Sequence, residues 1–143
     1  MNNFELFGTA LTLQCNKKRE LIAVNNREAE EVILTGCELT AIGSEVFKGL
    51  KKLTRLVIGE GVRVIAQEAC FGCPLEELEL PRSLTKVGAK AFWGIRTNFV
   101  KYSGTIDDWF EVIRNSGFDF FGGTVILQCA DGDLSFGPLA YDK

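Results

Sequence analysis

Cys70 and Cys73 form a C-x-x-C motif, the spacing that thiol–disulfide enzymes use for an attacking thiolate and its resolving partner. That chemistry needs a thiolate whose pKa is lowered at the N-terminus of a helix. Here the two cysteines fall at the end of a predicted helical turn, where the helix dipole disfavours a thiolate. We therefore expect two buried residues that act as small hydrophobic side chains, and we retain a thiol–disulfide enzyme as the remote alternative.

The remaining residue types give little support to other catalysts. The chain has no histidine, which excludes Ser-His-Asp and Cys-His catalysis and every metal site that contains histidine. A closed zinc site needs four ligands, and only one C-x-x-C motif is present. Asp107 and Asp108 are interpreted as charges at a helix start, and Asp131 and Asp133 as parts of a hairpin turn. We expect no catalytic residues, no cofactor and no metal.

The other three cysteines complete an odd total of five, which does not resemble a full disulfide framework. Cys37 is predicted to be exposed in a turn, either as a point of capture for another chain, as a mark of a reducing compartment, or without a role. Cys15 and Cys129 are predicted to lie in opposite caps of the molecule, too far apart to bond to each other within a monomer.

The repeats that position these residues are the strongest signal in the sequence. The segments 39–49, 62–72 and 84–94 align, and their anchor recurs as Ile42, Ile65 and Val87, at steps of 23 and 22 residues. The aromatic position of each segment carries Phe47, Cys70 or Phe92. A period in this range is typical of a leucine-rich solenoid, in which each unit is buried by its neighbours.

Each repeat is predicted to contain a strand, a turn, a second short extended piece and a single helical turn. The strands are expected at 33–35, 56–58 and 78–80, and the helical turns at 44–48, 67–71 and 89–93. We expect the first and third residues of each strand to be buried and the middle residue to be exposed, because side chains alternate along a strand.

Atypical segments are expected to cap both ends of this array. Residues 11–15 and 20–24 are predicted to form a hairpin, and 124–129 and 134–136 a second one. Residues 105–115 are predicted to form a helix with a capping box between Thr105 and Asp108 and an apolar face of Trp109, Phe110 and Ile113. We therefore expect a single domain, with an N-terminal cap over 1–31, three repeats over 32–95 and a C-terminal degenerate repeat, helix and hairpin over 96–143.

The repeat L-x-x-[IV]-G-x-x-[AV]-F-x-G, seen most clearly at residues 78–92, resembles the BspA-like leucine-rich repeat family over about residues 32–133. The chain departs from the family pattern at Ala66 and Cys70. The resemblance implies a right-handed α/β solenoid of short parallel strands and short helical turns. It also implies a role in adhesion or protein binding, often at bacterial or protist surfaces, and no catalytic residues.

The predicted exposed row of the strand ladder is the candidate protein-binding site. Its middle positions are Leu34, Val57 and Glu79, with Val100 as a possible fourth member. Leu34 and Val57, with Val64 of the second ladder, are expected to form an apolar stripe edged by Arg55, Arg63, Glu77 and Glu79. The candidate site residues are Leu34, Arg55, Val57, Arg63, Val64 and Glu79. Three possibilities remain open: the stripe binds a protein, the caps fold over it, or the chain self-associates as a structural or adhesion component.

Composition limits the partner more than the compartment. The formal net charge of −3 gives no basic footprint for nucleic acid, and no apolar stretch reaches the roughly 20 residues of a membrane-spanning helix. The first residues lack the pattern of a secretory signal. We expect a protein partner of unknown identity and possible homo-oligomers. The compartment stays open: cytoplasmic if the chain is complete, or the cell surface or outside the cell, as the resemblance also allows.

Overall fold

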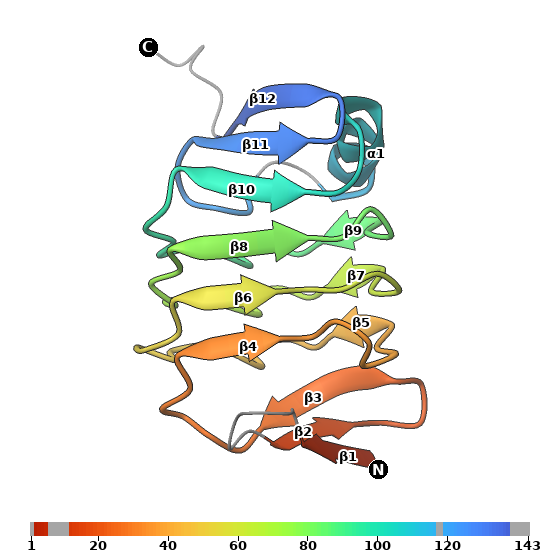
Figure 1. The fold of residues 1–143 in the computed structure, drawn as a ribbon, viewed down its shortest axis with the longest axis vertical. Helices are drawn as coiled ribbons and strands as arrows, with labels where there is room; N and C mark the ends of the chain where they lie inside the picture. Colours follow the sequence, from red (N-terminus) through yellow and green to blue (C-terminus); the bar gives the residue numbers. More distant parts are fainter. Residues whose placement is uncertain (1, 6–11, 117–118, 138–143) are drawn as a thin grey trace.

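The chain forms a solenoid of short stacked strands, seen here in a computed structural model that describes residues 2–5, 12–116 and 119–137 (Figure 1). Two six-stranded sheets run along the stack, and a single α-helix, α1 (Ile106–Ser116), is found among the described residues. The predicted stack of parallel strands is therefore confirmed. It arises because no repeat contains enough apolar surface to form a core alone.

Sheet I contains the longer strand of each repeat, in the order β12-β11-β10-β8-β6-β4. Neighbouring strands from β4 to β11 are parallel, and only β12 is antiparallel to its neighbour. The strands are β4 (Glu31–Ile33), β6 (Arg55–Val57), β8 (Glu77–Leu80), β10 (Phe99–Tyr102), β11 (Val125–Cys129) and β12 (Gly132–Phe136).

Sheet II contains the second, shorter strand of each repeat, in the order β1-β2-β3-β5-β7-β9. The pairs β1–β2 and β2–β3 are antiparallel, and β3 then begins a parallel ladder through β5, β7 and β9. The strands are β1 (Asn2–Glu5), β2 (Thr12–Cys15), β3 (Glu20–Val24), β5 (Ala41–Ile42), β7 (Val64–Ile65) and β9 (Lys86–Val87).

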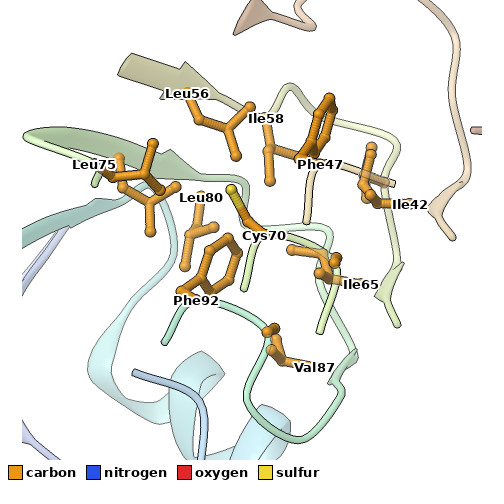
Figure 2. Packing of buried hydrophobic residues seen from close by; sticks show 14 of the residues in the cluster. Ile42, Phe47, Leu56, Ile58, Ile65, Cys70, Leu75, Leu80, Val87 and Phe92 are labelled. Atoms are coloured by element: carbon orange, nitrogen blue, oxygen red, sulfur yellow. The ribbon is translucent and has the colours of Figure 1, made fainter. Parts of the chain in front are cut away.

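The core lies between the two sheets and is built from equivalent residues of successive repeats. The anchors Ile42, Ile65 and Val87 are all buried, and so are the residues of the aromatic position, Phe47, Cys70 and Phe92 (Figure 2). Sheet I contributes inward-facing side chains such as Leu56 and Leu80 (Figure 2). The repeat alignment therefore identified these buried positions of the second and third repeats correctly, but it was wrong for Val57, which was predicted to be exposed and is buried.

The segments predicted as helical turns are hydrogen-bonded turns without α-helix. Glu45, Glu68 and Lys90 have positive φ angles of 60°, 54° and 58°, which do not occur within a right-handed helix. Backbone amides of these segments bond to the next repeat: the Phe47 amide donates to the Ala69 carbonyl at 2.7 Å. Bonding between repeats replaces the bonding within a segment that a helix would need.

The C-terminal cap confirms the predicted helix and hairpin. Thr105 and Asp108 form the capping box: the Asp108 amide donates to Thr105 Oγ1 at 3.1 Å, and the Thr105 amide donates to Asp108 Oδ2 at 2.9 Å. The predicted apolar face is wrong in one respect, because Trp109 is buried with Val112 whereas Phe110 is 45% exposed. The helix covers the open edge of sheet II, where the amide of Val87 in β9 donates to Ser116 Oγ at 3.0 Å.

The N-terminal hairpin of β2 and β3 is also confirmed, and β1 adds a strand that the sequence pattern did not predict. The division of the chain into two caps and three central repeats remains our interpretation of this architecture.

Candidate functional site

The outward side of sheet I presents two rows of side chains that run across the strands. Strand register places Glu31, Arg55 and Glu77 opposite one another, and Ile33, Val57 and Glu79 opposite one another. The rows continue onto β10 and β11 through Phe99 with Ile126 and through Lys101 with Gln128. We call these ten outward residues the sheet I face.

The predicted exposed row of Leu34, Val57 and Glu79 was wrong by one residue in the first repeat. Leu34 was expected on the outside, yet it is 2% exposed and belongs to the core, and Ile33 takes the outward position. The cause is one additional residue in the turn of this repeat: five steps separate Leu34 from Leu39, whereas four separate Ile58 from Val62. A shift of one residue moves a side chain to the other side of a strand.

The other predicted members divide between the two sheets. Arg55, Val57 and Glu79 lie on the sheet I face, although Val57 is only 8% exposed. Val64 is half-buried in β7 of sheet II, and the exposed Arg63 directly precedes that strand. The single continuous stripe of Leu34, Val57 and Val64 is therefore wrong.

The residues that most clearly expose apolar and basic groups on the sheet I face were not among the predicted site residues. Phe99 is 54% exposed, the largest exposure among the large hydrophobic residues described, and Lys101 is exposed two residues later. Val100, which was considered as an outward residue, is fully buried. The charge on Lys101 could have identified these residues in the sequence, because a charged side chain shows which side of the strand faces solvent. Side chains alternate along a strand, so Phe99, two residues earlier, lies on the same side as Lys101.

Charge on the sheet I face is organised around Arg55. Its guanidinium forms ion pairs with Glu31 of the preceding strand and with Glu77 of the following strand, the second at 3.0 Å between Nε and Oε2. The hydrogen bond to Glu31 is the main reason that the pKa of Arg55 is raised above its ordinary value. These exposed pairs fix the position of the arginine, and each adds little to stability.

A small cleft lies on the same face over β8, β10 and β11. It has a volume of about 170 Å³ and is lined by Glu76, Glu77, Leu78, Glu79, Thr97, Phe99, Lys101 and Gln128. Among the described residues, no ion pair involves Glu76, Glu79 or Lys101. Carboxylates and an exposed aromatic ring therefore meet at one hollow of the sheet I face.

The C-x-x-C motif lies within the core. Cys70 and Cys73 are fully buried, and the Cys70 sulfur lies in the cluster that contains Phe47 and Phe92 (Figure 2). Burial raises the pKa of the Cys70 thiol well above its ordinary value, and the Cys73 thiol donates to the Phe47 carbonyl oxygen at 2.9 Å. Both thiols are thus held away from solvent, as the repeat alignment predicted.

The remaining cysteines lie near the two ends of the stack and are free thiols. Cys37 was expected to be exposed but is half-buried and packs against the core. Cys15 is in β2 of sheet II and Cys129 in β11 of sheet I, near opposite ends of the stack (Figure 1).

Within the described part of the chain, no group of three or more histidine, cysteine, aspartate or glutamate side chains could hold a metal ion. Among the same residues, no helix is both long and apolar enough to cross a membrane.

Comparison with known proteins gives one match. The family model described as a BspA type leucine rich repeat region matches residues 18–109, with six copies. No curated protein and no solved structure is significantly similar to the chain.

Proposed function

Because the chain belongs to the BspA-type leucine-rich repeat family, we propose that it is a non-enzymatic interaction module that binds another protein through the sheet I face. The family in general suggests protein–protein interaction or adhesion, and its repeats are typically non-enzymatic. Parallel solenoid ladders offer an extended surface whose side chains are held by the stack, which suits recognition of a protein surface.

One observation carries this proposal: the half-exposed ring of Phe99 on a face that also presents ordered charges. Phe99 is 54% exposed and adjoins the cleft, while Arg55 is fixed between carboxylates of both neighbouring strands. An exposed aromatic ring on a face that also carries arginine and carboxylates has the composition of a binding hot spot with a polar rim.

The test is a pull-down from the native host with matched variants of the two sheets. The double variant Phe99→Ala/Glu79→Lys truncates one apolar side chain and reverses one charge on the sheet I face. The control Val64→Ala/Arg63→Glu makes the same kinds of change on sheet II. We expect the first variant to lose the captured protein and the second to retain it, with unchanged circular dichroism spectra for both. Capture that survives the sheet I variant contradicts the proposal.

A second candidate function is self-association through strand β4. Among the described strands, sheet I ends on β4, while the N-terminal strands β1, β2 and β3 extend only sheet II. On the side of β4 that faces β6, the amide of Leu34 donates to the Val57 carbonyl at 2.8 Å. The opposite edge of β4 has no strand partner in the described residues. An open edge of this kind is a site at which another chain can add a strand. Light scattering that shows a strict monomer at high concentration contradicts this candidate.

A further inference from the structure

We propose that the cleft over β8 and β10 binds one long basic side chain, lysine or arginine, from an extended segment of the partner, and that an apolar side chain of the same segment packs on Phe99. This inference rests on the proposed function, because it assigns partner chemistry to part of the sheet I face.

The size of the cleft favours a single side chain over a small-molecule ligand. Its volume of about 170 Å³ lies below the roughly 300–1,000 Å³ of pockets that enclose cofactors and drug-sized molecules. Each water occupies about 30 Å³ of liquid, so the hollow corresponds to a handful of waters. An unbranched stem with a charged end fills such a space and keeps its polar group near the carboxylates.

The charge of the lining selects a basic occupant. Glu76, Glu77 and Glu79 are the three acidic residues that line the cleft, and Lys101 is the one basic residue of the lining. Glu77 is already paired with Arg55, whereas Glu76 and Glu79 have no ion pair among the described residues. Lys101 lies opposite Glu79 in register and offsets part of the charge. The lining nevertheless keeps an excess of negative charge, which matches lysine or arginine by electrostatic complementarity.

The spacing of the groups favours an extended segment with a basic and an apolar residue two positions apart. Glu77 and Glu79 are outward residues two positions apart on β8, and register places Lys101 of β10 opposite Glu79. Phe99 is two positions before Lys101 on the same side of β10, so it is a diagonal neighbour of Glu79. Diagonal neighbours on adjacent strands are about 7–8 Å apart, so Phe99 lies near this distance from Glu79. Alternate side chains of an extended chain are spaced by about 6.6 Å, twice the rise per residue. A basic residue at the acidic side chains therefore brings a residue two positions away, before or after it in the segment, to the Phe99 ring.

The experiment uses a phage-displayed library of random linear peptides selected on the folded, full-length chain. We expect the selected peptides to share a lysine or arginine and an aromatic or aliphatic residue two positions away from it, in one consistent order. One selected peptide, made synthetically with a fluorescent label, then gives affinities by fluorescence polarisation. Its affinity should fall about tenfold with Glu76→Gln/Glu79→Gln and by at least as much with Phe99→Ala. Affinity should also fall as salt rises, since the contact is electrostatic.

The matched control is Asp107→Asn/Glu111→Gln, which removes the same number of carboxylates from α1 and should leave the affinity unchanged. Selected peptides without a basic residue, or binding that is insensitive to the Glu76/Glu79 pair, would overturn the basic occupant. Failure to select any peptide would overturn recognition of a linear segment. Either failure would leave the proposed function to be judged by its own experiment, the pull-down with Phe99→Ala/Glu79→Lys. That experiment uses the intact partner and does not depend on which side chain enters the cleft.

Discussion

Replacement of Cys70 by serine tests the assignment of the C-x-x-C motif to the core. The Cys70 side chain is fully buried in the apolar cluster, so Cys70→Ser exchanges a weakly polar thiol for a hydroxyl that needs a hydrogen-bond partner. The Cys70 thiol is hydrogen-bonded to the Cys73 sulfur, a weak acceptor, while Cys73 itself donates to the Phe47 carbonyl at 2.9 Å. A buried hydroxyl that has only so weak a partner costs about 1–3 kcal/mol by mutational data, and we expect the free energy of unfolding to fall by this amount.

Two further serine variants serve as controls in the same urea titrations, followed by circular dichroism. Cys73→Ser keeps a donor for the Phe47 carbonyl, so its loss of stability should be smaller than that of Cys70→Ser. Cys37→Ser changes a half-buried residue near the surface and should stay within about 0.5 kcal/mol of the wild type.

Labelling of the native thiols completes this test. We expect the native Cys70 and Cys73 thiols to resist Ellman's reagent, because both are fully buried. The core assignment is refuted by wild-type stability of Cys70→Ser, or by labelling of Cys70 in the native state as fast as that of Cys37. Fast labelling of both motif thiols would also revive the thiol-enzyme alternative.

Three other predictions concern the packing of the repeats and the C-terminal cap. Gly88→Ala should cost about 1–3 kcal/mol in a thermal or urea melt, because its new Cβ would lie 2.3 Å from the Gln67 nitrogen, whereas Gly123→Ala, with open space around it, should be neutral. Thr105→Ala should cost about 0.5–2 kcal/mol through loss of the helix cap, and Thr105→Ser should recover most of it; equal stability of all three proteins would contradict the capping role. The hydrogen bond from the Thr105 amide lowers the pKa of Asp108 below 3.8, so its stabilisation is complete above pH 3.8 and is lost as the pH falls through the lowered value. Asp108→Asn should therefore reduce the acid sensitivity of unfolding, and identical acid titrations for both proteins would disprove this linkage.

The repeat pattern predicted the core well wherever the units have equal length. Leu56 to Ile65 and Leu78 to Val87 are both nine steps along the chain, so one alignment places both repeats. In the first repeat, Val32 to Ile42 is ten steps, and an alignment without a gap moved the strand by one position. Local alternation carried the correcting signal, since Glu31 is charged and Val32 is apolar. The repeat period predicts buried positions by their distance from the anchor residue of each repeat. An extra residue in the turn leaves the anchor buried but shifts the strand before it by one position.

The candidate site was less predictable because it depends on neighbours in space. A strand pattern shows which side chains alternate, but register between strands decides that Lys101 lies opposite Glu79, and the stacking of β8 and β10 brings Phe99 and Glu77 to the same cleft. Arg63 and Arg55 are close in the sequence, yet they lie on different sheets because the turn between β6 and β7 takes the chain from one sheet to the other.

The sequence by itself determined the solenoid, the buried thiols and the helix at its C-terminal end. These features follow from short-range patterns: a repeated apolar anchor, a cysteine at an aromatic position, and a threonine three residues before an aspartate. The tertiary structure alone decided that the helical turns are turns bonded to the next repeat and that a cleft lined by acidic residues and Phe99 exists. Those outcomes depend on hydrogen bonds and register between repeats, which form only when the units stack.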